Sequence, residues 1–158
     1  RLYAKQMLYK SKPCLLGLDP LAENFTLNSF SEMLKKNPGR MIKSFLLDQK
    51  YIAGMGNIYT DETLFRAGIN PGRKVGSLSL KEINRLFESL LSTLKEGINC
   101  RGTSISDYRD IWGQEGEFQK RLKVYRREGS NCLRCGGAIR RKVVAGRGTY
   151  YCPVCQPL

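Results

Sequence analysis

Histidine does not occur among the 158 residues of this chain. Catalysis by an imidazole is therefore excluded, and any metal ion would have to be bound by cysteine or carboxylate groups. Long apolar runs are also missing, because no stretch of the sequence reaches the roughly 18 apolar residues of a membrane-spanning helix. The sequence thus predicts that a membrane is not a partner of this protein.

Acidic residues are scarce in the last quarter of the chain. Residues 119–158 contain ten lysines and arginines but a single acid, Glu128, and the whole chain has a formal net charge of +13. Such a concentration of positive charge attracts polyanions, and nucleic acid is the first candidate. An anionic membrane surface is the second, but no helix with a large apolar face accompanies the charge.

An initiator methionine and the apolar segment of a secretory leader are both missing at the start, Arg1-Leu2. We therefore expect a piece of a longer intracellular protein. Residues 1–18 have no clear pattern, and we expect them to be a linker or the remnant of a preceding domain.

The six cysteines include two Cys-x-x-Cys pairs, Cys132 with Cys135 and Cys152 with Cys155, separated by sixteen residues. This spacing is typical of a tetrahedral site for one structural Zn²⁺, which leaves no open position for catalysis. The alternative is two disulfides, which an intracellular protein disfavours.

The residues between the two pairs predict a β-hairpin. Residues 138–144 and 149–151 are β-branched and aromatic, and residues 145–148 form a glycine-rich tip that includes Arg147. Arg140 and Arg141 lie on one arm and should point to opposite faces. A narrow hairpin with an arginine at its tip suits a groove of duplex DNA. The alternative for such a basic run is a solvated surface.

Helical patterns fill residues 26–36, 41–50, 58–67 and 79–98, and Ser79 with Glu82 forms a capping box for the longest helix. Its apolar stripe, which extends to Ile98, is expected to be core. The fold class is therefore mainly α with a small β zinc ribbon. We expect a helical domain over residues 19–126, with one more short helix containing Phe118, Leu122 and Tyr125, and a zinc finger over 127–158.

A glycine-rich turn, Gly54-Met55-Gly56-Asn57, precedes the third of these helices. Glycines allow a ligand to approach the backbone closely, and a helix N-terminus favours a phosphate. The alternative is an ordinary turn. Residues 100–117 show no periodicity, and an irregular stretch of this length is typical of a functional loop.

Several motifs resemble the formamidopyrimidine-DNA glycosylase/endonuclease VIII family. Residues 53–62 are similar to the helix-two-turns-helix signature of that family, and residues 148–156 are similar to its zinc finger. The resemblance covers residues 16–157. It implies a helix-two-turns-helix bundle followed by a zinc-finger hairpin with four cysteine ligands, here without the catalytic N-terminal domain of the parent protein.

This resemblance implies roles for particular residues. Asn57 and the backbone at Gly54 and Gly56 would bind phosphates around the lesion, Lys43 would lie near the extruded nucleotide, and Arg147 would enter the minor groove. The loop from Thr103 to Phe118, with Ser104 and Tyr108, would close over a flipped base. The DNA-binding residues implied are Lys43, Gly54, Gly56, Asn57, Arg140, Arg141 and Arg147.

The family resemblance implies a glycosylase and abasic-site lyase that acts on damaged double-stranded DNA. The loop is long, as in the formamidopyrimidine branch of that family, which implies oxidised purines, 8-oxoguanine and formamidopyrimidine, as substrates. The alternatives are an endonuclease VIII-type enzyme for oxidised pyrimidines and a stand-alone, non-catalytic DNA-binding module. The N-terminal Pro-Glu of the family is absent here, so we expect no catalytic residue in this chain and an active intact parent. A monomer in the bacterial cytoplasm or nucleoid is expected.

Two arginines and one glutamate depart from the family pattern. Arg101 and Arg126 stand where the family usually has glycine, which makes the local turn geometry at these positions uncertain. Glu117 adds an acid near the expected lesion loop.

Overall fold

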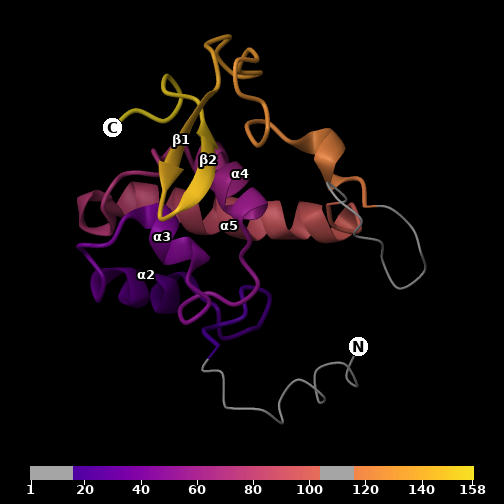
Figure 1. Cartoon of the computed structure of the whole chain (residues 1–158). Coiled ribbons are helices and arrows are strands. Elements are labelled where there is room, and N and C mark those ends of the chain that lie inside the picture. Colours follow the sequence, from indigo (N-terminus) through magenta and orange to yellow (C-terminus); the bar gives the residue numbers. More distant parts are fainter. Residues whose placement is uncertain (1–15, 104–115) are drawn as a thin grey trace.

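The computed structural model describes residues 16–103 and 116–158, and within them most regular structure is helical (Figure 1). Two strands form an antiparallel hairpin that stands against one of the helices (Figure 1). The elements are α2 (Leu27–Lys35), α3 (Ile42–Leu47), α4 (Asn57–Ala67), α5 (Leu80–Asn99), β1 (Arg140–Val144) and β2 (Arg147–Tyr151), with 3-10 helices at Val75–Ser77 and Phe118–Arg121. The predicted fold class, mainly α with a small β ribbon, is confirmed.

Helix α4 lies at the centre of the fold. It packs against α3, α5 and β2, and all residues from Thr60 to Phe65 are buried. A helix that is buried on all sides must find partners for its polar side chains inside the protein. Asp61 and Glu62, in the middle of α4, are therefore candidates for bonds to neighbouring elements.

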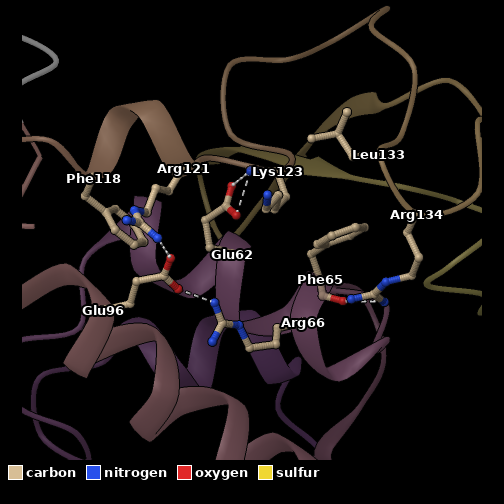
Figure 2. A pocket seen from close by; sticks show the side chains of 9 residues that line it. All are labelled: Glu62, Phe65, Arg66, Glu96, Phe118, Arg121, Lys123, Leu133 and Arg134. Carbon is tan, nitrogen blue, oxygen red and sulfur yellow. Dashed lines mark hydrogen bonds and ion pairs between the residues drawn. The ribbon is translucent and has the colours of Figure 1, made fainter. Parts of the chain in front are cut away.

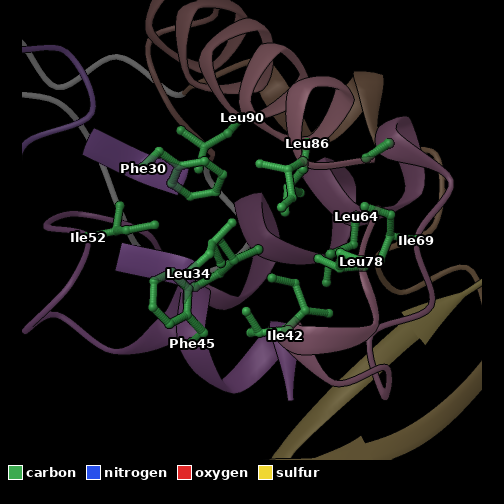
Figure 3. Packing of buried hydrophobic residues seen from close by; sticks show 14 of the residues in the cluster. Phe30, Leu34, Ile42, Phe45, Ile52, Leu64, Ile69, Leu78, Leu86 and Leu90 are labelled. Carbon is green, nitrogen blue, oxygen red and sulfur yellow. The ribbon is translucent and has the colours of Figure 1, made fainter. Parts of the chain in front are cut away.

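The main hydrophobic core lies between α2, α3, α4 and α5 (Figure 3). Rings of Phe25, Phe30 and Phe87 lie within 5.8 Å of one another, centroid to centroid. A second, smaller cluster joins α4 to the ribbon and consists of Phe65, Val124, Cys132, Ile139 and Cys152. Among the described residues, we find no helix that is both long and apolar enough to cross a bilayer.

The capping box at the start of α5 is present as predicted. Ser79 Oγ accepts a hydrogen bond from the backbone N–H of Glu82, and the Glu82 carboxylate accepts one from the N–H of Ser79. Arg73 forms an ion pair with the same carboxylate, and this pairing lowers the pKa of Glu82 to about 2.

We expect Ser79→Ala to lower the free energy of unfolding by about 1 kcal/mol, because one N–H at the helix start loses its acceptor. Urea unfolding followed by circular dichroism, with zinc present throughout, would measure the change. Ser79→Thr keeps a hydroxyl and serves as the control. Equal stability of the alanine variant and the parent would contradict this assignment.

Three helix predictions need correction. The second helix ends at Leu47 rather than Lys50, because Asp48 is extended (φ −79°, ψ 109°) and its carboxylate accepts the N–H of Lys50. Ile98 is 50% exposed rather than core. The helix before the ribbon is a single 3-10 turn over Phe118–Arg121, which excludes both Leu122 and Tyr125.

The boundary expected at residue 18 also moves. Leu18 pairs with Ile52 in a β-bridge, and the N–H of Ala53 donates to the Leu18 carbonyl at 2.9 Å. Residues 16–18 therefore pack as part of the helical domain, while residues 1–15 lie outside the described part of the chain.

The hairpin turns over two residues, Ala145 and Gly146. Both have positive φ, 52° and 70°, as in the I′ turns that suit the twist of paired strands. Val144 pairs with Arg147, so Arg147 is the first residue of β2 rather than part of a four-residue tip. The predicted tip was therefore two residues too long, although Arg147 is exposed as expected and lies directly beside the turn.

Candidate nucleic-acid interface and metal centre

The four cysteines of the two Cys-x-x-Cys pairs come together at the end of the ribbon away from its turn. Their Sγ atoms all lie within 4.8 Å of one another, with Cys132 to Cys155 at 3.8 Å and Cys135 to Cys152 at 3.4 Å. Four thiolates about 2.3 Å from a tetrahedral zinc lie about 3.8 Å apart, whereas disulfide sulfurs lie about 2.05 Å apart. The cysteines thus fit one structural Zn²⁺.

Backbone N–H groups surround these sulfurs. Those of Arg134 and Gly137 donate to the Sγ atoms of Cys132 and Cys135, each at 3.4 Å. Such bonds favour thiolates, which are the form that binds zinc. The centre is closed, because all four positions of a tetrahedral ion are taken by protein sulfur, and its role is structural.

The start of β2 is fixed on the helical domain by polar side chains. Asn57, the first residue of α4, donates from Nδ2 to the Gly148 carbonyl at 2.9 Å. Lys43 Nζ donates to Thr149 Oγ1 at 2.8 Å and forms an ion pair with Asp61 at 2.6 Å. One glycine carbonyl in the strand therefore links the turn before α4 to the arginine-bearing end of the hairpin.

Lys43 itself is not available to a nucleotide. Its side chain has 0% exposure, and burial lowers its pKa although the neighbouring Asp61 opposes that shift. A fully enclosed ammonium with protein acceptors cannot contact DNA directly. Burial therefore contradicts direct DNA binding by Lys43, whereas its place near an extruded nucleotide stays a prediction.

The turn before α4 is shaped by Gln49, a residue of the family signature that had no role assigned to it from the sequence. Its Oε1 accepts the Gly54 N–H at 2.8 Å and its Nε2 donates to the Met55 carbonyl at 2.9 Å. Gly54 has φ +81°, a conformation that L side chains rarely adopt. No described side chain caps the start of α4, so its first N–H groups are available to an external acceptor.

A cavity of about 300 Å³ opens at this end of α4. One N–H of the Asn57 side-chain amide donates to the Gly148 carbonyl, and the amide has a second N–H. Its Oδ1 is buried with no partner among the described residues. What this end can offer an anion is therefore the backbone of the first turn together with the second amide N–H of Asn57. The cavity is lined by Gly56, Asn57, Ile58, Tyr59, Gly102 and Thr103.

The remaining basic residues of the ribbon divide into two groups. Arg140, Arg141 and Arg147 are exposed. Lys142 instead faces the helical domain, where its Nζ donates to Asn70 Oδ1 at 2.8 Å and lies 4.4 Å from the centroid of the Tyr151 ring. The three exposed arginines are thus the ones that can meet a polyanion.

A second hollow, of about 310 Å³, lies toward the other end of α4, beside Leu133 and Arg134 of the first Cys-x-x-Cys pair (Figure 2). Glu62 points from α4 to the backbone there, and its carboxylate accepts the N–H of Lys123 (Figure 2). The same carboxylate accepts the N–H groups of Val124 and Tyr125, and all these bonds measure 2.9–3.0 Å. Burial raises the pKa of Glu62, and these three bonds oppose that shift. Through Glu62, α4 is therefore hydrogen-bonded to residues 123–125, the segment that precedes the zinc finger.

Two family models match the chain. Residues 129–158 match the zinc finger found in FPG and IleRS, and residues 16–109, more than half of the chain, match the formamidopyrimidine-DNA glycosylase H2TH domain. This chain belongs to the formamidopyrimidine-DNA glycosylase family. The helical part is its H2TH domain, and the ribbon is its zinc finger with one structural zinc.

Named relatives extend this result. A formamidopyrimidine-DNA glycosylase of Pelotomaculum thermopropionicum is 50% identical over 89% of this chain and 51% of its own length. One of Geobacillus kaustophilus is 47% identical over 98% of this chain and 56% of its own length. The chain therefore spans about half the length of the curated relatives it matches.

Solved structures agree with the H2TH and zinc-finger arrangement. The MutM (Fpg) protein of Thermus thermophilus matches with a TM-score of 0.85 and 46% identity, over 90% of this chain and 54% of that one. The Lactococcus lactis Fpg in complex with DNA containing an abasic site matches with a TM-score of 0.84 and 38% identity, over 99% and 55%.

The loop expected to cover a lesion is described only at its two ends. The Cys100 carbonyl accepts the N–H of Glu117 at 2.7 Å, so the two ends lie together at the last turn of α5. Thr103 lies in the cavity at the start of α4, with its Oγ1 3.5 Å from Tyr59 OH. Ser104 and Tyr108 lie outside the described residues.

Arg101 and Arg126, where the resemblance implied glycine, both adopt a left-handed backbone conformation that favours glycine. Arg101 has φ 57° and Arg126 has φ 56°. Non-glycine residues in this region carry strain of about 1 kcal/mol or more. The turn after α5 and the turn before the zinc finger therefore each hold an arginine in a strained conformation.

Proposed function

We propose that this chain is the DNA-binding part of a base-excision-repair glycosylase and abasic-site lyase that removes oxidised purines, 8-oxoguanine and formamidopyrimidine, from duplex DNA. The observation that carries the proposal is the hydrogen bond from Asn57 Nδ2 to the Gly148 carbonyl at 2.9 Å. It brings the open N-terminal end of α4 next to Arg147. Both groups favour phosphates, so together they suit one stretch of DNA backbone.

In this proposal, each group at the interface has a defined contact with DNA. The backbone N–H groups of residues 56–59 bind phosphate, and Asn57, which holds the zinc finger through one amide N–H, donates its other amide N–H to phosphate. Arg147 enters the minor groove from the start of β2, and Arg140 and Arg141 add positive charge along the finger. Such contacts position a damaged duplex without selecting its sequence.

Removal of a base from duplex DNA requires that the nucleotide is first turned out of the stack, at a cost of a few kcal/mol. The phosphate contacts offset this cost. We propose that the cavity lined by Tyr59 and Thr103, together with Ser104 and Tyr108, covers the extruded base. The nucleophile would come from the half of the relatives' length that this chain does not span.

The names of the related structures support this choice of substrate. The Lactococcus lactis Fpg is recorded in complexes with DNA containing an abasic site and with DNA containing Fapy-dG. A protein with this role would act on the genome, in the bacterial cytoplasm or nucleoid. An endonuclease VIII-type preference for oxidised pyrimidines is the alternative, to be separated by comparing duplexes that carry the two kinds of lesion.

Arg147→Ala tests the proposal directly. We expect the dissociation constant for a duplex containing an abasic-site analogue to rise about 10- to 100-fold, because charge-assisted hydrogen bonds contribute about 1.5–3 kcal/mol. The slope of log K against log salt should fall by about one, as for the loss of one phosphate contact. Fluorescence anisotropy at several salt concentrations measures both quantities.

Lys81→Ala is the control, because Lys81 is an exposed cation on α5. Its binding should match that of the parent within about twofold. Unchanged affinity and slope in Arg147→Ala would contradict the proposed docking. Equal affinity of the parent for abasic duplex and for RNA would favour a zinc finger that serves other contacts.

A further inference from the structure

The buried charges at the centre of the fold have no role in the function proposed so far. Lys43 and Asp61 both have side chains with 0% exposure, and their ion pair joins α3 to α4. Lys43 Nζ has three acceptors: Asp61 Oδ1 at 2.6 Å, Thr149 Oγ1 at 2.8 Å and the Gly148 carbonyl at 3.3 Å. These satisfy its three protons, so the ammonium is fully used inside the protein.

Asp61 completes the connection from the other side. Its Oδ2 accepts the backbone N–H of Tyr150 at 2.9 Å. Thr149 Oγ1 in turn donates to the Arg147 carbonyl at 2.9 Å. The pair thus bonds to three consecutive residues, Gly148, Thr149 and Tyr150, that follow directly after Arg147.

An ion pair in this position is costly. Burial raises the pKa of Asp61 and lowers that of Lys43, and in both cases burial is the largest cause. Apolar side chains of similar volume often stabilise a protein as well as a buried ion pair does. Unlike an apolar contact, the charged pair forms directional hydrogen bonds, and each bond fixes the position of one atom at the start of β2.

Arg147 also interacts with the pair through its charge. Its guanidinium is near enough to contribute to the lowered pKa of Lys43, since two cations repel each other. The Asp61 carboxylate offsets that repulsion. Loss of the carboxylate alone would leave two like charges close together at the start of β2.

We propose that Lys43 and Asp61 are positioning residues that hold residues 148–150 in one register on α4 and so fix Arg147 beside the N-terminal end of that helix, without touching DNA themselves. The zinc fixes β2 at its other end, at Cys152, and the ion pair fixes it near Arg147. This inference rests on the proposed function, because it assigns the purpose of the pair to the DNA contact of Arg147.

A double-mutant cycle with Arg147 tests the inference. Lys43→Met combined with Asp61→Asn removes both charges and keeps an acceptor for the Tyr150 N–H. We expect this variant to bind abasic duplex about tenfold more weakly and to lose about one unit of salt slope, although neither residue reaches solvent. In the Arg147→Ala background the same pair of substitutions should change affinity by less than about twofold, because the group that it positions is already gone.

Glu62→Gln is the matched control, because Glu62 is a second buried carboxylate of α4 that bonds to backbone at a different place. Any effect of this variant on binding should be equally large with and without Arg147. Fully additive effects of the Lys43/Asp61 substitutions and Arg147→Ala would overturn the inference, and so would unchanged affinity of the Lys43/Asp61 variant.

Two further measurements cover the remaining outcomes. If the double variant does not fold, Thr149→Val removes one Lys43 acceptor and the bond to the Arg147 carbonyl with little change of volume, and it should show the same non-additivity on a smaller scale. If Arg147→Ala alone leaves binding unchanged, the proposed function fails. The positioning is then judged without DNA, by the ¹⁵N order parameter of the Arg147 amide, which should fall in the Lys43/Asp61 variant while that of Cys152 stays constant; an unchanged value at Arg147 overturns it.

Discussion

Removal of the zinc is expected to abolish specific duplex binding while most of the helix content remains. Within the described part of the chain, the zinc finger shares with the H2TH domain a small apolar cluster of five buried residues, against which Tyr150 and Cys155 pack. A cluster of this size does not order a two-stranded hairpin in water, and structural zinc contributes about 10–16 kcal/mol of binding free energy in isolated finger peptides. Without the ion, the start of β2 loses its fixed position.

The helices should survive, because their core lies elsewhere. Sixteen buried residues pack between α2, α3, α4 and α5 without any residue of the finger. Once the hairpin unfolds, Asp61 and Glu62 meet water instead of the β2 and 123–125 backbone, which relieves their burial. We therefore expect a loss of more than about 100-fold in duplex affinity, since both the metal and the arginine contact are lost.

Chelation followed by anisotropy and far-ultraviolet circular dichroism measures both parts of this result. Cys132→Ser should reproduce the effect of chelation. Cys100→Ser is the matched control, because Cys100 is a free cysteine at the end of α5, away from the four ligands. Retention of tight abasic-duplex binding by the zinc-free protein would show that the finger is not the part that contacts DNA.

Replacement of Glu62 by alanine should be the most destabilising single substitution outside the metal site. Three backbone N–H groups, those of residues 123–125, would lose their acceptor at once. An unsatisfied buried donor costs about 1–3 kcal/mol, so we expect a loss of about 3 kcal/mol or more in the free energy of unfolding.

Glu62→Gln separates hydrogen bonding from charge. Its remaining carbonyl oxygen can still accept from Val124 and Tyr125, so this variant should lose clearly less stability than Glu62→Ala. Urea unfolding at saturating zinc measures the difference. Equal losses in the two variants would mean that the carboxylate charge, rather than its acceptor geometry, stabilises the junction.

Features that depend on local sequence were predictable. The capping box of Ser79 and Glu82 and the zinc ligands Cys132, Cys135, Cys152 and Cys155 follow from residue types at short, fixed spacings, and the structure confirms them. The turn of the hairpin was harder to predict from the sequence. Ala145 adopts a positive φ that alanine rarely takes, so the sequence suggested a longer tip and placed Arg147 outside the strand.

Long-range polar contacts were not predictable from the sequence. Lys43 meets Gly148 across 105 positions, and Asp61 meets Tyr150 across 89. Nothing in the local pattern around Lys43 distinguishes an exposed cation from one enclosed by the zinc finger. The acidic pair Asp61-Glu62, within a helix that is buried along most of its length, was the available signal, because buried acids require partners.

Part of the attachment between the zinc finger and the H2TH domain is asymmetric. On α4, Asn57, Asp61 and Glu62 supply side chains, whereas residues 123–125, 148 and 150 supply main-chain atoms. Main-chain atoms are the same whatever the side chain, so over evolutionary time substitutions should accumulate more easily at these positions than at the three side chains of α4.

Elsewhere the finger supplies side chains of its own. Arg134, Lys142 and Gln156 donate to Phe65, Asn70 and Ile69, in that order. For protein engineering, a related finger could therefore be exchanged onto this H2TH domain if it kept those three donors.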